Sequence, residues 1–252
     1  MPVCSLRYFS DALKKHSEAI VLLPRPALAP PYHVMFLLHG LSDDASIWTR
    51  HTSIERYLGD LPLMEVMPDG GRGFYCDAAE GYAYETAIGV ELPGLIRQYF
   101  PTKEAWCVAG LSMGGYGAAK LGLRFPELFV SAHSHSGALG FGHKKEYLDS
   151  DMAPEFRRIL GPSPIGGPND LYGLAEGLAP GKRPKLRIDC GVDDFLIEDN
   201  RLFHAHLDKL GFAHEYQEFP GAHTWEYWDV HVQEAIRFHC GNLGIEPLVA
   251  ES

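Results

Sequence analysis

Residues 106–129, WCVAGLSMGGYGAAKLGLRFPELF, place Ser112 between two glycines in the pattern G-x-S-x-G. An apolar run typical of a strand, AWCVAG, precedes the serine, and a small-residue helical pattern, GGYGAAKLGLRF, follows it. In a sharp strand-to-helix turn, side chains at positions 110 and 114 would collide with the neighbouring elements, so Gly110 and Gly114 fit there. A serine presented on such a turn becomes a nucleophile once a base takes its proton, and this context predicts that role for Ser112.

The sequence around this turn alternates short apolar runs with longer helical patterns, which is typical of an α/β domain. The run HVMFLLHG at 33–40 is almost continuously apolar and predicts a central strand that is buried on both faces. We therefore predict an α/β fold with a mostly parallel central sheet and helices on both faces. Strands are expected at 5–10, 18–24, 33–40, 63–69, 104–110, 129–137, 185–191 and 214–221, and helices at 46–58, 84–100, 114–125, 196–211 and 224–241.

Residues 141–181 interrupt this alternation, because they contain many glycines, prolines and charged side chains. A chain of 252 residues is long enough to bury a large core and is a common length for a single α/β domain. We expect one domain over residues 1–252, in which 141–181 form a small cap-like excursion over the sheet edge.

A nucleophilic serine on such a turn needs a histidine base and an acid, and along the chain these follow the serine in the order acid, then histidine. His223 fits the base, because it lies in the loop FPGAHTW between the last predicted strand and the terminal helix. The loop after the strand at 185–191 contains both Asp193 and Asp194. Spacing alone does not separate these two candidates for the acid.

Acyl transfer also requires N–H donors aimed at the oxyanion that develops on the carbonyl carbon. The amide of Met113, directly after the serine, is one candidate. The other comes from the stretch LLHGLSDD, where His39 and Gly40 end a strand and the amide of Leu41 can turn inward. We predict Leu41 and Met113 as the oxyanion donors and His39 as a residue that braces the loop.

Together, several stretches resemble the esterase D family of α/β-hydrolases, particularly its tributyrin-esterase-like and acetyl-esterase-like members, and the resemblance runs from about residue 3 to residue 240. The matching stretches are LLHGLSDDASIW (37–48), MPDGGRGFYCD (67–77), ELPGLIRQYFP (91–101), GLSMGGYGAAKLGLRFPELF (110–129), CGVDDFLIEDN (190–200) and PGAHTWEYWD (220–229). We interpret the chain as a metal-independent carboxylesterase that acts on small, mostly uncharged esters through an acyl-serine intermediate, and the resemblance implies that the acyl groups are short. It also implies Asp194 as the acid beside Ser112 and His223, and a homo-oligomer as one assembly open to the chain.

Other activities of the same family remain alternatives. An S-formylglutathione hydrolase is the nearest rival, but the cysteine stretch of its oxyanion loop is not matched by HGLSDDAS, and an anionic thioester favours basic residues near the site. Feruloyl, acetyl-sugar and siderophore esterases are also open. From another class, a catalytically idle binding protein with the hydrolase fold would leave the serine, aspartate, histidine and oxyanion loop unexplained.

Aromatic residues near the motifs are candidates for a substrate pocket. Trp225 follows the predicted base by two residues, so we expect it to line the acyl or alcohol pocket, with Trp48 and Tyr75 as further pocket candidates. Packing in the core is the alternative for these aromatic residues. His133 and His135 alternate on one strand face and form a potential metal pair, but the sequence shows no third ligand at useful spacing. We therefore expect no metal and no cofactor.

Composition excludes several classes of partner. The net charge of -11 argues against nucleic acid, which requires a concentrated basic surface. No apolar stretch approaches the roughly 20 residues that span a bilayer, and the N-terminal residues lack the order of a signal peptide. Five cysteines without a C-x-x-C pair indicate reduced thiols. A small-molecule ester as partner and a cytoplasmic location are the expectations.

Overall fold

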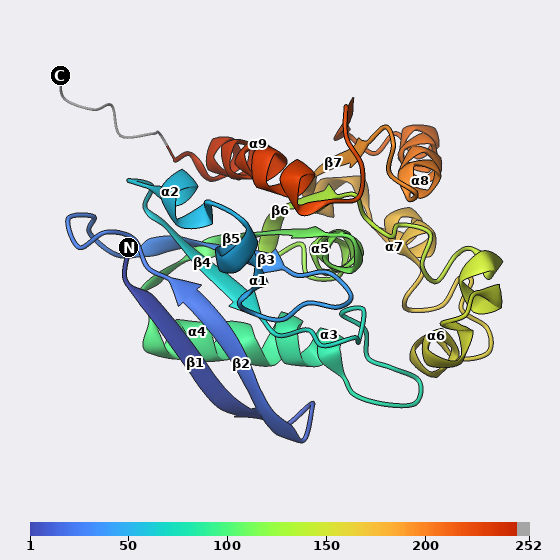
Figure 1. Cartoon of the computed structure of the whole chain (residues 1–252), viewed down its shortest axis with the longest axis horizontal. Coiled ribbons are helices and arrows are strands. Elements are labelled where there is room, and N and C mark those ends of the chain that lie inside the picture. Colours follow the sequence, from blue (N-terminus) through green and yellow to red (C-terminus); the bar gives the residue numbers. More distant parts are fainter. Residues whose placement is uncertain (246–252) are drawn as a thin grey trace.

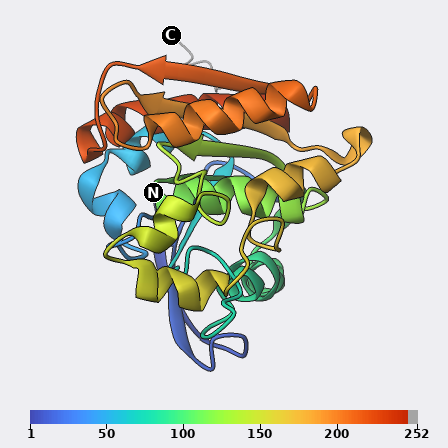
Figure 2. The ribbon, with the colours of Figure 1, turned by 90° about the vertical axis from the view of Figure 1, so that its right-hand side faces the viewer.

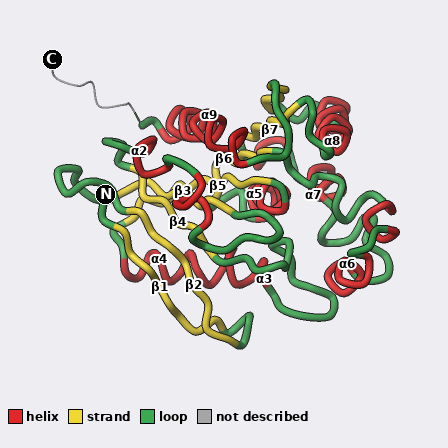
Figure 3. The backbone as a smooth tube through the Cα atoms, viewed as in Figure 1, coloured by secondary structure: helices red, strands yellow, loops and turns green. Residues whose placement is uncertain are grey.

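A computed structural model describes residues 1–245, and its centre is an eight-stranded sheet with the order β1-β2-β4-β3-β5-β6-β7-β8 (Figure 1). The strands are β1 (Val3–Ser10), β2 (Lys15–Leu22), β3 (Tyr32–Leu38), β4 (Leu63–Pro68), β5 (Thr102–Leu111), β6 (Phe129–His135), β7 (Lys185–Gly191) and β8 (His214–Phe219). Strand β2 pairs antiparallel with both of its neighbours, β1 and β4, and Figure 3 shows the β1–β2 hairpin at one end of the sheet. The other six strands are parallel, as predicted.

Helices cover both faces of the sheet because the side chains of each central strand alternate between two apolar clusters. In β3, Val34 and Phe36 enter one cluster, whereas Met35 and Leu37 enter the other. Helices α1 (Ile47–His51), α2 (Ile54–Leu58) and α9 (Trp225–Leu243) cover the face of Met35, and α4 (Leu92–Tyr99), α5 (Met113–Arg124) and α8 (Ile197–Lys209) cover the face of Val34. Within residues 1–245, no helix combines the length and apolar composition needed to cross a bilayer.

The segment between β6 and β7 contains η2 (Lys145–Asp149), α6 (Ala153–Leu160), α7 (Leu171–Gly177) and η3 (Pro180–Lys182). Figure 2 turns this segment toward the viewer. It shares the core of the domain, since Phe141 stacks on Phe74 at 3.9 Å between ring centroids and Phe156 is buried against both rings. The segment is therefore packed onto the sheet domain through aromatic contacts.

Two predicted helices differ in detail from the structure. The helix expected at 46–58 divides into α1 and α2, because Thr52 is extended and the amide of Ser53 donates to Asp229 Oδ1 (2.8 Å) on α9. The helix expected at 84–100 consists of α3 (Tyr84–Thr86), a π-helical turn η1 (Ala87–Glu91) and α4. The π turn precedes Pro93, whose missing N–H disfavours a regular helix at this point.

Glu65, in the middle of β4, is fully buried, and neither carboxyl oxygen has a hydrogen-bond partner among residues 1–245. It pairs in register with Leu22 on β2 and Met35 on β3, so it lies inside the sheet. Burial raises the pKa of Glu65 well above its ordinary value. The folded chain therefore binds this proton more tightly than the unfolded chain does, and the stability falls as the pH rises above about 4.5.

We predict that Glu65→Met stabilises the protein at pH 8 by about 1–3 kcal/mol, because the substitution removes an unpaired buried carboxyl group. The gain should shrink toward pH 5, because the pH then approaches the ordinary carboxyl pKa of the unfolded chain and keeping Glu65 protonated in the folded chain costs less. Urea unfolding midpoints at both pH values measure this difference. Glu104→Met, at a side chain that is 95% exposed, is the control and should show no such pH dependence. Equal gains for Glu65→Met at both pH values would contradict the prediction.

Candidate active site

Ser112 lies on a strained turn between β5 and α5, with φ 55° and ψ −115°. A positive φ is uncommon for a residue other than glycine and costs free energy. The turn is also crowded: a Cβ at Gly110 would overlap the carbonyl of Gly114, and a Cβ at Gly114 would overlap the carbonyl of Leu38. The glycines of the G-x-S-x-G pattern are therefore required by close packing of α5 against β3 and β5.

Two backbone hydrogen bonds hold the strained serine in place. The amide of Ser112 donates to the carbonyl of His135 at the end of β6 (2.9 Å), and the carbonyl of Ser112 accepts from the amide of Ala138 (3.1 Å). Both partners belong to the segment that leaves β6. The conformation of Ser112 thus depends on the neighbouring strand as well as on its own glycines.

The structure brings Ser112, His223 and Asp194 into one chain of hydrogen bonds. Ser112 Oγ lies 3.0 Å from His223 Nε2, and His223 Nδ1 lies 2.8 Å from Asp194 Oδ2. With Nδ1–H donating to the carboxylate, Nε2 is left to accept the serine proton. This arrangement can remove a proton from the serine and stabilise the imidazolium that results.

Residues 192–196, the loop between β7 and α8, are called the acid loop here. This loop distinguishes the two aspartates that spacing left open as candidates for the acid. Asp194 is 2% exposed, and its second oxygen accepts from the amide of Leu196 (2.8 Å), which fixes the carboxylate. Asp193 is exposed, and its amide donates to the carbonyl of Gly221 (2.9 Å). The structure therefore places Asp194, rather than Asp193, against His223.

The ring of His223 is flanked by two aromatic side chains. Trp228, in the first turn of α9, meets the imidazole edge-on at 4.8 Å between centroids. Phe195, which follows Asp194, lies 4.5 Å from the imidazole between ring centroids, and its side chain is 75% exposed. Phe195 was not predicted from the sequence, although it follows Asp194 directly. It offers an apolar surface to a substrate next to the histidine.

The loop after β3 approaches the serine from the other side. A Cβ at Gly40 would lie 3.8 Å from Ser112 Cβ, so Leu41 directly follows a residue that lies close to the serine. His39 braces this loop, because its Nε2 accepts from the amide of Gly70 (2.8 Å) and its Nδ1 lies 2.7 Å from the carbonyl of Gly40. This loop is therefore held close to Ser112 by hydrogen bonds of a buried imidazole.

The expectation that Trp48 and Tyr75 line a pocket is wrong. Both side chains are 0% exposed and donate to backbone carbonyls, Trp48 to Leu38 (3.1 Å) and Tyr75 to His39 (3.0 Å). They support the end of β3 from inside the core instead of facing a substrate. Trp225 is half-buried and packs edge-on against Trp48 at 5.3 Å.

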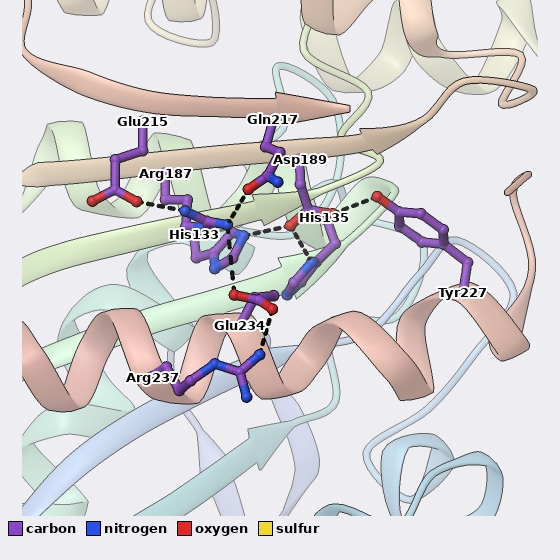
Figure 4. Close-up of polar contacts among 9 residues, drawn as sticks. All are labelled: His133, His135, Arg187, Asp189, Glu215, Gln217, Tyr227, Glu234 and Arg237. Carbon is purple, nitrogen blue, oxygen red and sulfur yellow. Dashed lines mark hydrogen bonds and ion pairs between the residues drawn. The ribbon is translucent and has the colours of Figure 1, made fainter. Parts of the chain in front are cut away.

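The structure supplies a third polar residue beside His133 and His135, which the sequence had left as a pair. Asp189 on β7 pairs in register with His135 on β6, and all three side chains are fully buried (Figure 4). No third ligand was named from the sequence, because Asp189 lies 56 positions from His133 along the chain and reaches it only through strand pairing. The alignment of two neighbouring parallel strands was the signal that could have found it.

Comparisons with known proteins identify the family of the chain. The family described as "Putative esterase" matches residues 10–171. The acetyl esterase of Caldicellulosiruptor saccharolyticus is 28% identical, over 94% of this chain and 98% of its own length. FphF, a fluorophosphonate-binding serine hydrolase of Staphylococcus aureus, has a TM-score of 0.84 at 30% identity, covering 94% of this chain and 97% of its own.

The S-formylglutathione hydrolase FrmB of Staphylococcus aureus is also similar, with a TM-score of 0.83 at 31% identity over 94% of this chain and 98% of its own. The family match covers more than half of the sequence, and these relatives align over nearly all of it. The chain therefore belongs to the Esterase family, and it is a carboxylic ester hydrolase with an α/β-hydrolase fold.

Proposed function

We propose that the protein is a serine carboxylesterase that cleaves small, short-chain acyl esters, with Ser112 as nucleophile, His223 as general base and acid, and Asp194 as the residue that orients the histidine. The observation that carries this proposal is the continuous chain of hydrogen bonds from Ser112 Oγ through His223 to Asp194. Its position at the strained turn after β5 supports it, because this turn exposes the serine hydroxyl.

In the acylation step, Ser112 Oγ attacks the ester carbonyl carbon while its proton moves to His223 Nε2. Asp194, as a buried carboxylate, stabilises the imidazolium that forms. The carbonyl oxygen becomes an oxyanion, for which the amides of Leu41 and Met113 are the proposed donors. Met113 is the first residue of α5, and the first amides of a helix have no partner within the helix.

The tetrahedral intermediate then collapses, the bond to the alcohol oxygen breaks, and His223 gives its proton to the departing alcohol. Water takes the place of the alcohol and loses a proton to His223 Nε2 as it attacks the acyl-serine carbonyl. The second collapse releases the carboxylic acid and returns the proton to Ser112 Oγ. The residues carry out both half-reactions without a cofactor.

The relatives support a short acyl group. One is an acetyl esterase and another an S-formylglutathione hydrolase, and formyl and acetyl are the two smallest acyl groups. The second relative also makes a thioester of glutathione the main competing substrate. A panel of p-nitrophenyl esters from acetyl to octanoyl, beside S-formylglutathione and a feruloyl ester, separates these activities. The highest kcat/KM for acetyl or propionyl esters is expected, and a preference for octanoyl, feruloyl or S-formylglutathione would contradict the proposed substrate class.

We predict that Ser112→Ala lowers kcat on p-nitrophenyl acetate by about 10⁴ to 10⁶, since removing the nucleophile leaves only weak residual catalysis. A fluorophosphonate probe should label the wild type at Ser112 and fail to label this variant. Ser131→Ala is a matched control, because Ser131 Oγ lies 2.8 Å from His239 Nδ1 in a second Ser–His pair that is fully buried. The control should retain labelling and turnover. A folded Ser112→Ala protein with near-normal activity would show that another residue is the nucleophile.

A second prediction concerns the acid. Asp194→Asn keeps the shape of the side chain but cannot favour the imidazolium, so kcat should fall by about 10⁴. Asp193→Asn should change kcat by less than about threefold, because an exposed side chain outside a hydrogen-bonded network contributes little. Rates between pH 6 and 9 on one short-chain ester, with thermal melts, measure both effects. If Asp193→Asn is the inactive variant, the assignment of Asp194 is wrong.

A further inference from the structure

A buried polar cluster joins β6, β7 and α9 (Figure 4). Asp189 Oδ2 lies 2.5 Å from His133 Nε2 and 2.7 Å from His135 Nδ1. The other oxygen, Oδ1, accepts a hydrogen bond from the hydroxyl of Tyr227 in the first turns of α9 (2.8 Å). One carboxylate thus joins two strands and one helix in the interior of the protein.

The contacts of Asp189 keep it ionised in spite of its burial. Burial alone raises the pKa of an aspartate, but the imidazoles of His135 and His133 beside the carboxyl group outweigh this effect and hold the pKa of Asp189 well below its ordinary value. Burial lowers the pKa of His133 to about 3, so this ring is neutral and donates from Nε2. The carboxylate therefore remains a strong acceptor for the hydroxyl of Tyr227.

The contact distances are too short for two ligands of one metal ion, and His133 and Asp189 are hydrogen-bonded to each other. Two ligands of a tetrahedral zinc ion, each about 2.0–2.1 Å from it, lie about 3.3 Å apart. The nitrogen–oxygen separations of 2.5 and 2.7 Å in the cluster are shorter than this. Arg187 lies beside the cluster in Figure 4. It donates a hydrogen bond to Gln217 (3.0 Å) and forms an ion pair with Glu234 (3.7 Å).

Through Tyr227, the cluster contacts the histidine loop, residues 220–224 between β8 and α9. The ring of Tyr227 packs against Gly221, where an added Cβ would lie 2.7 Å from Tyr227 Cδ2. Gly221 has φ 138° and precedes His223 by two residues, and its carbonyl accepts from the amide of Asp193 next to the acid. The position of Tyr227 therefore constrains the histidine loop and its contact with the acid loop.

Through His135, the cluster also contacts the backbone of Ser112. The side chain of His135 contacts Asp189, while its backbone carbonyl accepts from the amide of Ser112 (2.9 Å). The backbone carbonyl of Asp189 in turn accepts from the amide of Ser136 (2.8 Å), two residues before the partner of the Ser112 carbonyl. The cluster thus contacts the residues that hold Ser112, through His135, and the residues that hold His223, through Tyr227.

We propose that Asp189, His133, His135 and Tyr227 form a positioning network that holds His223 in hydrogen-bonding distance of Ser112. These residues do not touch the substrate, and they act through the hydroxyl of Tyr227, which fixes the ring that packs against the histidine loop. The proposal rests on the proposed roles of Ser112, His223 and Asp194. It adds that the geometry of these three depends on a buried carboxylate outside the site.

The test is Tyr227→Phe, which removes the hydroxyl and keeps the ring against Gly221. We expect kcat on p-nitrophenyl acetate to fall by about 10-fold while KM changes by less than about twofold, because misalignment of a catalytic group affects the chemical step. The downfield proton resonance of the His223 Nδ1–H bond to Asp194 should shift or broaden. Rates are expressed per active site by titration with a fluorophosphonate, so that misfolded protein does not count.

Tyr216→Phe is the matched control. Tyr216 also donates its hydroxyl to a carboxylate at 2.8 Å, that of Glu218, and it lies on β8, the strand that leads to the histidine loop. Its ring stacks on His204 of α8, away from the cluster. This variant should keep the wild-type kcat and the wild-type resonance.

Two outcomes would overturn the positioning network. One is a Tyr227→Phe protein whose kcat per titrated site and proton resonance equal those of the wild type. The other is a stoichiometric metal ion in the purified wild type whose removal by EDTA abolishes activity, because the cluster would then ligate a metal. Failure of the proposed function is distinct, since it would appear as activity retained in Ser112→Ala or Asp194→Asn whatever Tyr227→Phe does.

Discussion

The close approach of α5 to the ends of β3 and β5 is the constraint on which the site depends. Glycines at 110 and 114 permit this approach, since a side chain at either position would overlap backbone atoms. The approach forces Ser112 into a positive φ, and the hydrogen bonds to His135 and Ala138 hold it there. A half-buried serine at the end of a buried parallel sheet is the direct result of this packing.

The rest of the site is assembled around that fixed serine by loops that meet at the same edge of the sheet. In parallel strands the carboxyl ends lie together, so the loops after β3, β5, β7 and β8 converge. Backbone contacts between Asp193 and Gly221 join the acid loop to the histidine loop. The imidazole of His39 holds the loop after β3. Rigid strands below and short hydrogen-bonded loops above give a site that is organised before a substrate binds.

The local sequence was sufficient to predict the elements whose conformation depends on neighbouring residues along the chain. The strand, the turn and the helix around Ser112 follow from apolar patterning and glycine spacing, and the position of His223 follows from its loop after the last strand. The division between α1 and α2 was not predictable, because it depends on Asp229 of α9 binding the amide of Ser53. The pocket role expected for Trp48 and Tyr75 was wrong because patterning does not show which aromatic side chains turn into the core.

The sequence by itself determined the fold class, the strained turn and the kinds of residue available for acyl transfer, because these depend on periodicity and on the steric demands of neighbouring residues. Only the tertiary structure decided which groups meet. Ser112 and His223 are 111 positions apart, and Asp189 lies 56 positions from His133, so their contacts arise from strand order and register. The choice of Asp194 over Asp193 at His223 follows from the backbone of one loop, in which adjacent side chains point in different directions.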